Sequence, residues 1–91
     1  MNRTELIKAV AVSTGLTIKD ATAAVEATLS TITATVATGE KVSILGFGTF
    51  EKKHREARIG RNPHNGEIVE IEATDVPVFK PGKEFKEKVN G

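Results

Sequence analysis

The chain has 91 residues, of which 38% are hydrophobic and 27% charged, and its formal net charge at pH 7 is +1. This length predicts one small domain, whose own apolar surface is only marginally sufficient to stabilise it. Four phenylalanines are the only aromatic residues and cysteine is absent, which excludes disulfides and thiolate metal sites. Small domains without such crosslinks often complete their core by oligomerising, so we expect a dimer with an apolar interface.

No targeting or membrane-spanning segment is expected. Residues 1–5 lead directly into an amphipathic pattern and do not resemble a secretory signal. No apolar run approaches the ~20 residues that span a bilayer. We therefore expect a soluble intracellular protein.

Residues 1–39 predict two helices joined by a short turn. Asn2 and Glu5 have the spacing of a capping box that opens the first helix. Gly15 is suited to the left-handed conformation that ends a helix. Thr17 and Asp20 then repeat the capping pattern at the start of the second helix.

The second helix, which ends at Gly39, carries an apolar seam with spacings of 4, 3 and 4 residues, as in coiled coils. Among residues 18–38 only Lys19 could read base edges, so a helix-turn-helix reader is not favoured. We interpret the two helices as a dimerisation scaffold. The expected dimer interface combines the seam with three phenylalanines: Val25, Leu29, Ile32, Val36, Phe47, Phe50 and Phe79.

After Gly39 the periodicity becomes that of strands. Residues 42–45 predict a short strand, residues 46–48 a tight turn, and a second strand runs from Thr49 through Ile59. These segments predict the beginning of an antiparallel sheet.

The returning half of this sheet begins at a hairpin. Asn65 and Gly66 form a sequence typical of two-residue hairpin turns. Residues 68–71 and 76–79 then predict strands that return to the body of the domain. Pro77 has no N–H to donate, which predicts that the last segment is an edge strand or a bulge.

A last short helix is expected after Pro81 and Gly82. Phe85 and Val89 would lie on its inner face. Its other sides carry the lysines Lys83, Lys86 and Lys88.

Positive charge is concentrated in residues 52–61 and in the tail from Lys80. The distribution of this charge matters more than the net charge of the chain. Residues 52–61 hold five bases against one acid, whereas residues 62–79 hold four acids and no base. Composition alone favours a solvated charged face. A cationic run that ends at a proline-containing turn indicates instead a finger laid along a polyanion, and DNA is the expected partner. The bases are Lys52, Lys53, Arg55, Arg58 and Arg61.

The sequence shows no catalytic, cofactor or metal motif. Gly46 and Gly48 match only part of a dinucleotide fingerprint and precede a strand, so a turn whose backbone N–H groups hold a phosphate is the better interpretation. His54 and His64 have no carboxylate or cysteine at ligand spacing. The phenylalanines are needed for the core more than as platforms for stacking bases. We expect neither an enzyme nor a cofactor.

Pro63 has two interpretations. Beside an asparagine at a hairpin tip, a proline commonly fixes a turn. Flanked by cations on a projecting ribbon, its rigid ring could instead act as an apolar wedge between base pairs. The residues alone leave both interpretations open.

Several motifs are shared with a known family. They are residues 1–7 (MNRTELI), 46–50 (GFGTF), 76–79 (VPVF) and 81–83 (PGK), with Arg55, Arg58, Gly60, Asn62, Pro63 and Asn65 at the family's spacing. Over essentially its whole length, the chain resembles the HU/IHF family of bacterial nucleoid-associated, DNA-bending proteins.

The resemblance implies an α+β fold. An intertwined homodimer would have a helical base, and each subunit would add a three-stranded antiparallel sheet that extends into a two-stranded β-ribbon arm. The implied segments are a helical dimerisation hairpin (1–39), a sheet body (40–51 and 74–81), the DNA-binding arm (52–73) and a C-terminal helix (82–91).

The resemblance also implies a function: binding of double-stranded DNA through the minor groove with little sequence specificity, with bending and compaction. Minor-groove binding is a known property of HU and IHF and is carried over with the resemblance. The protein would act in the cytoplasm on the nucleoid, in a bacterium or encoded by a phage, without a small-molecule substrate. The implied DNA contacts are Arg3, Gly46, Gly48, Lys53, Arg55, Arg58, Arg61, Asn62, Pro63, Asn65, Lys80, Lys83 and Lys86.

Two features of the arm need a structural answer. Its cations are spaced by three residues and would alternate faces on a flat strand, unless the ribbon is strongly twisted or bulged. The returning strand carries Glu67, Glu70 and Glu72 where the family commonly has lysines. We expect these acids to pair across the ribbon with Lys53, Arg55 or Arg58 and to lower the affinity for DNA.

Two alternatives stay open: a sequence-selective, IHF-like factor, and a structural or assembly protein whose arms contact another protein through these acids.

Overall fold

The computed structural model describes residues 1–91 and contains three helices and five strands, which confirms the α+β class. The chain divides into two compact units, Met1–Ala34 and Thr35–Gly91, which we describe separately. None of the helices combines the length and the apolar character that crossing a membrane requires. The elements are α1 (Arg3–Thr14), α2 (Ile18–Ala37), β1 (Val42–Ile44), β2 (Gly48–Arg55), β3 (Arg58–Arg61), β4 (Ile68–Ile71), β5 (Thr74–Pro81) and α3 (Lys83–Asn90).

The predicted helix caps are present in the first unit. The side-chain oxygen of Asn2 accepts a hydrogen bond from the Glu5 N–H at 2.9 Å. Gly15 ends α1 in the left-handed conformation, with φ 76°. The Thr17 hydroxyl accepts from the Asp20 N–H at 3.1 Å at the start of α2. The Asn2 and Thr17 caps each satisfy a backbone donor that the first turn of a helix would otherwise leave without a partner.

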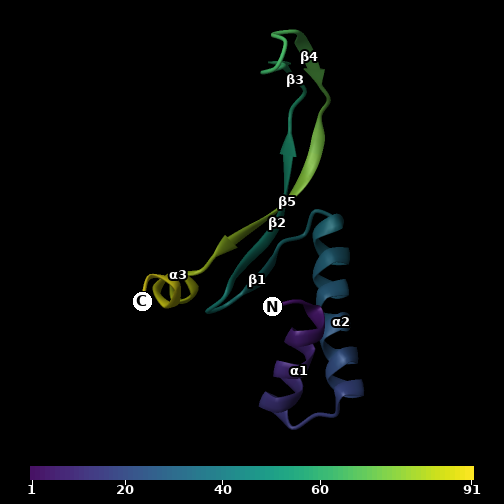
Figure 1. Ribbon diagram of the computed structural model, residues 1–91, viewed down its shortest axis with the longest axis vertical. Coiled ribbons are helices and arrows are strands. Elements are labelled where there is room, and N and C mark those ends of the chain that lie inside the picture. The colour runs from purple at the N-terminus through teal and green to yellow at the C-terminus, as the bar shows by residue number, and fades with distance from the viewer. The chain divides into compact units, whose positions relative to one another are not determined.

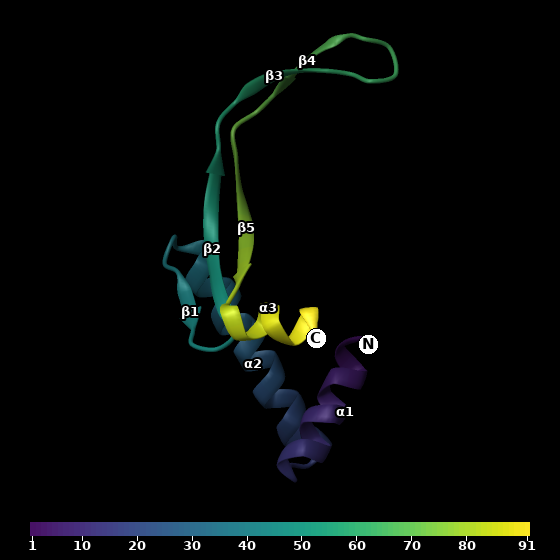
Figure 2. The same cartoon turned by 90° about the vertical axis from the view of Figure 1, so that its left-hand side faces the viewer.

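The core of the first unit is small. Ile7 and Ala11 of α1 pack with Ala21 of α2, and the partly buried Val10 and Val25 cover them. The two helices lie side by side in both views (Figures 1 and 2). Three buried side chains make a core that needs further apolar cover, because a small domain buries a smaller fraction of its surface than a large one.

The second unit is built on an antiparallel sheet in the order β1-β2-β5. The edge position of β5 confirms the expectation from Pro77, since an edge strand tolerates a residue without an N–H. Rings from the β1–β2 turn, β2, β5 and α3 pack together with centroid distances between 4.7 and 6.3 Å. They belong to Phe47, Phe50, Phe79 and Phe85.

The long second strand that the sequence predicted is interrupted. The strand β2 ends at Arg55 and β3 begins at Arg58, while β4 ends at Ile71 and β5 begins at Thr74. The interruption contains two unpaired residues on each strand, 56–57 and 72–73. Because the numbers are equal, the β3/β4 pairing continues the register of β2/β5, and no bulge forms. Figure 2 shows the ribbon changing direction here. The sequences Glu-Ala at 56–57 and 72–73 account for the break, because glutamate and alanine are disfavoured in strands.

The tip is a four-residue loop, residues 63–66, and the predicted two-residue turn is wrong. The Asn62 N–H donates to the Glu67 carbonyl at 2.7 Å, and the Asn62 carbonyl accepts from the Gly66 N–H at 2.8 Å. A type I′ turn needs positive φ at both central residues. Only Gly66 has it, at 72°, and Asn65 does not.

Candidate nucleic-acid interface

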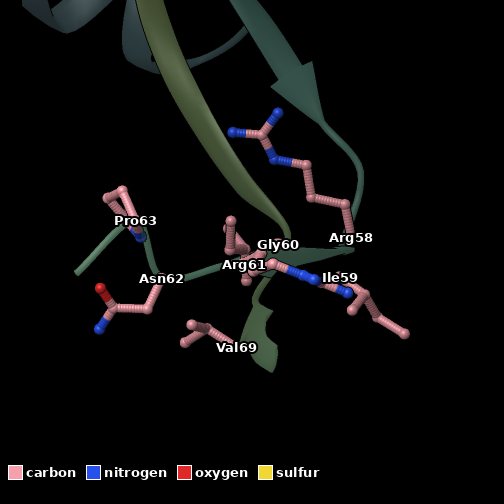
Figure 3. Close-up of a pocket in the computed structure, with 8 residues that line it drawn as sticks. Arg58, Ile59, Gly60, Arg61, Asn62, Pro63 and Val69 are labelled. Carbon is pink, nitrogen blue, oxygen red and sulfur yellow. The ribbon is translucent and has the colours of Figure 1, made fainter. Parts of the chain in front are cut away.

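The outer arm, consisting of β3, β4 and their loop, carries an open groove of about 510 Å³. Among the residues that line the groove, Pro63 and Asn62 lie at one end, and Arg58 and Ile59 lie at the other (Figure 3). Cationic and apolar side chains therefore share one depression. Its lining residues are Arg58, Ile59, Gly60, Arg61, Asn62, Pro63, Val69 and Ile71.

The two arginines of β3 lie beside isoleucines. Arg58 is opposite Ile71 and Arg61 is opposite Ile68 in the ladder, and opposed residues of an antiparallel pair project from the same face. Arg58 and Arg61 thus start on opposite faces, as the spacing of three predicts for a flat ribbon. Both nevertheless line the same groove.

Gly60 lines this groove between the two arginines in sequence. A Cβ atom at Gly60 would lie 2.9 Å from the Cδ1 atom of Ile71. The end of the Ile71 side chain therefore lies close against position 60. A larger residue at position 60 would have to displace the end of the flexible Ile71 side chain, while the backbone of Gly60 has an ordinary conformation.

The expected pairing of the acids with the arm cations is wrong. None of the ion pairs includes Glu67, Glu70, Glu72 or an arginine of the arm. The register explains this, because Glu70 faces Ile59 while both arginines of β3 face isoleucines. Arg55, Arg58 and Arg61 therefore keep their charge uncompensated by any contact.

Side-chain hydrogen bonds hold the loop that carries Pro63. The Asn62 Oδ1 atom accepts from the His64 N–H, and the Asn65 Oδ1 atom accepts from the Glu67 N–H, both at 2.9 Å. Such bonds to the backbone two residues on are typical of asparagine in turns. The amide NH2 groups of Asn62 and Asn65 remain available as donors, and Pro63 is exposed.

Lys52 belongs to the cationic run in the sequence, but its side chain contacts other groups of the protein. Its Nζ atom donates to the carbonyl of Ala37, the last residue of α2, at 3.2 Å and lies 3.5 Å from Asp75. Asp75 also contacts the Nδ1 atom of His54 at 2.8 Å. The hydrogen bond from His54 lowers the pKa of Asp75, and Lys52 acts in the same direction against desolvation. Sequence reasoning missed this cluster, for which the only signal was the equal distance of His54 and Asp75 from the tip.

The lysines of the body are partly compensated by acids. The side chain of Glu51 is only 13% exposed and contacts the Nζ atoms of Lys80 at 2.7 Å and Lys41 at 3.4 Å. The hydrogen bond from Lys80 lowers the pKa of Glu51, and Lys41 contributes to the same effect against desolvation. Lys83 lies 3.9 Å from Glu87 in α3. The arm is thus the less compensated of the two cationic segments.

The two glycines of the β1–β2 turn have different roles. Gly46 is exposed with φ 83°, and the carboxylate of Glu84 lies 2.8 Å from where its Cβ atom would stand. Gly48 is buried, and its Cβ atom would lie 2.6 Å from the Lys80 carbonyl oxygen. Gly48 thus lies in the strand β2 between β1 and β5, and its contact with a phosphate stays a prediction.

The apolar seam of α2 divides into covered and uncovered positions. Val25 packs on the core of the first unit, and Val36 is buried in the second. Leu29 remains 42% exposed, and Ile32 is half-buried. Arg3, the first residue of α1, is exposed and forms no ion pair.

The fold and this site define an α+β protein with a cationic, proline-tipped β-ribbon arm. A sequence model of the family described as bacterial DNA-binding protein matches residues 1–90. The chain is 55% identical to the DNA-binding protein HU of Geobacillus stearothermophilus over 89 residues, which cover 98% of this chain and 99% of that protein. The chain belongs to the HU/IHF family of bacterial DNA-binding proteins, as its motifs indicated.

Two further comparisons agree. The chain is 52% identical to DNA-binding protein HU 1 of Bacillus subtilis (strain 168) over 91 residues, covering 100% of this chain and 99% of that one. A cocrystal structure of Anabaena HU with DNA superposes with a TM-score of 0.90 at 50% identity, covering 98% of this chain and 97% of that chain. The similarity extends through the arm as well as the body.

Proposed function

We propose that this protein is a histone-like protein that binds double-stranded DNA through the minor groove with little sequence specificity, and bends and compacts it. The observation that carries the proposal is the groove of the outer arm, where uncompensated Arg58 and Arg61 lead to an exposed Pro63. Contacts from cations to phosphates do not depend on sequence. The similar Anabaena HU is a DNA complex in its crystal.

The bend follows from the chemistry of the tip. Pro63 has no N–H that insertion would leave without a partner, and its ring is rigid. Apolar wedges of this kind unstack a base step in the minor groove, and the kinked duplex can then follow more of the protein. A strong bend costs on the order of 1–10 kcal/mol. The arginines of the arm offset this cost through their contacts to DNA.

The proposed interface combines the arm with cations of the body. In the body, Lys80 would exchange the carboxylate of Glu51 for a phosphate, and Glu84 would move aside from Gly46. The protein acts by binding and not by catalysis, and its place is the bacterial nucleoid. The proposed DNA contacts are Arg3, Gly46, Gly48, Lys53, Arg55, Arg58, Arg61, Asn62, Pro63, Asn65, Lys80, Lys83 and Lys86.

A homodimer is part of the proposal. A single chain buries only four hydrophobic side chains and leaves Leu29, Ile44 and Phe47 about 40% exposed. Burial of this apolar surface against a second copy is favourable and would stabilise the fold. In the dimer, residues 1–39 form the helical base, residues 40–51 and 74–81 the sheet body, residues 52–73 the arm, and residues 82–91 the last helix.

Gel-shift experiments with intact, nicked and gapped duplexes at two salt concentrations test the function. We expect binding to all sequences, preference for the flexible duplexes, and a steep loss with salt, with a slope of about −0.9 per phosphate neutralised. Binding confined to one sequence would indicate an IHF-like factor. Absence of salt-sensitive DNA binding would overturn the proposal in favour of an assembly role for the arm.

A further inference from the structure

The loop at the tip of the arm contains a chemically reactive pair of residues. Asn65 is followed by Gly66, and both are exposed. An asparagine loses its amide when the backbone nitrogen of the next residue attacks the side-chain amide carbon. Glycine hinders this attack least, because it has no Cβ atom. A Cβ atom placed on Gly66 would have no neighbour within 4 Å, so the fold does not crowd the pair from outside.

Two hydrogen bonds of the loop act on this reaction in opposite directions. The Asn65 Oδ1 atom accepts from the Glu67 N–H at 2.9 Å. A donor at this oxygen stabilises the negative charge that the oxygen gains during the attack. The Gly66 N–H donates to the Asn62 carbonyl at 2.8 Å, which holds the proton that the attacking nitrogen must lose. Exposed hydrogen bonds of loops open at low free-energy cost, so the nitrogen is released whenever this one opens.

We propose that Asn65 is a site of spontaneous deamidation and that its product weakens the contact of the arm with DNA, a consequence that rests on the proposed function. The Gly66 nitrogen forms a bond to the Asn65 Cγ atom and loses its proton, and the side-chain nitrogen leaves with a proton as ammonia. Water then opens the succinimide ring by breaking one of its two C–N bonds. The product carries aspartate or isoaspartate at position 65. The reaction consumes one water and needs no oxidant or reductant.

The conversion changes the charge of a surface that is proposed to contact DNA. The amide NH2 of Asn65 is a donor without a partner in the loop, whereas an ionised carboxylate only accepts. The carboxylate of the aspartate product still accepts from the Glu67 N–H, so the loop keeps this hydrogen bond. No acid contacts Arg58 or Arg61 before the conversion. The new negative charge therefore lowers the positive potential of the outer arm and repels phosphates.

The other asparagines of the chain provide internal references. Asn62 precedes a proline, whose nitrogen has no proton to lose. Asn2 precedes an arginine, and its side chain caps α1. Both should keep their amides. Asn90 also precedes a glycine, at the end of α3, and is not among the proposed DNA contacts. In every sample it is replaced by Asn90→Gln, which leaves Asn65 as the one asparagine followed by glycine.

The first test measures the reaction without DNA. The full chain with Asn90→Gln is incubated at mildly alkaline pH, and its proteolytic peptides are quantified by mass spectrometry over time. We expect the acid to accumulate at position 65 while positions 2 and 62 keep their amides. Asn65→Gln is the matched variant, because glutamine must close a larger ring and should stay intact. If position 65 keeps its amide as long as positions 2 and 62, the proposal is wrong.

The second test measures DNA binding of fresh and aged protein. Asn65→Asp represents the modified state and should bind an intact duplex about two- to fivefold more weakly for each arm, the range of one exposed ion contact. Rising salt should reduce this difference. Aged protein should approach the affinity of Asn65→Asp, whereas aged Asn65→Gln should bind as its fresh form does. Equal affinities of Asn65→Asp and the fresh protein would overturn the effect on DNA. If no form binds DNA, the proposed function fails and the mass-spectrometric result still decides whether Asn65 is modified.

Discussion

Arg58 lies directly opposite Ile71 across the β3/β4 ladder, and no carboxylate contacts its guanidinium. The same holds for Arg61, which faces Ile68. The register therefore separates the arginines from the glutamates of the returning strand. A chain with a net charge of only +1 can in this way present a cationic groove, because local charge, and not its sum, attracts a polyanion.

Replacing Arg58 or Arg61 by alanine should weaken binding to all DNA sequences about equally. Each arginine neutralises phosphate charge, so each variant should also reduce the salt slope by about 1. Binding isotherms on several unrelated duplexes at a series of salt concentrations measure both effects. Lys8→Ala, which removes an exposed cation of α1 outside the proposed interface, is the control. A loss confined to particular sequences would indicate base readout.

Pro63→Ala should reduce bending more than binding. The variant keeps the cations of the arm and loses the ring that unstacks a base step. FRET between duplex ends at saturating protein reports the bend independently of affinity, and we expect a smaller angle on intact duplex. Nicked or gapped DNA bends at lower cost, so its binding should be less affected. An unchanged bend angle on intact duplex would show that Pro63 only shapes the loop at the tip.

Leu29→Ala should destabilise the dimer and the fold together. Leu29 is 42% exposed in a single chain, so its truncation is severe only if a second copy covers it. In that case the loss is about 2–5 kcal/mol, as for a core leucine. Thermal unfolding at several protein concentrations and sedimentation measure the two effects. Val12→Ala, at a position that is 86% exposed, should change stability by less than ~0.5 kcal/mol. A folded monomer at micromolar concentration would contradict the dimer.

Glu51→Gln should lower stability and raise DNA affinity at neutral pH. Lys80 and Lys41 lower the pKa of Glu51 in the folded protein. The stabilising effect of the carboxylate is therefore present above the ordinary glutamate pKa of about 4.3 and is lost as pH falls through the lowered folded value.

Denaturant unfolding of both proteins between neutral and acid pH checks this sign. The difference between wild type and variant should shrink as the solution becomes more acid than about pH 4. At neutral pH the variant also frees Lys80 for phosphate, so tighter DNA binding should accompany the lower stability. If Glu51→Gln is less stable and also binds DNA more weakly than the wild type, Lys80 has only a structural role.

The features that the sequence alone predicted depend on neighbouring residues. Asn2 and Thr17 cap their helices through backbone groups three residues away, and Pro77 lies on an edge strand because it lacks a donor. The cationic run and the family motifs are likewise continuous in the chain. For such features the relevant interaction is set by sequence separation, so a pattern is sufficient to predict them.

The tertiary structure alone decided which charges are compensated and where the ribbon breaks. Lys52 reaches Asp75 and Ala37, whereas Arg58 faces Ile71. Gly48 is closed in by the backbone of Lys80. These contacts depend on the pairing of strands whose residues are far apart in the chain. One residue of register would place every side chain on the other face, so no local pattern specifies which cation meets an acid and which meets an isoleucine.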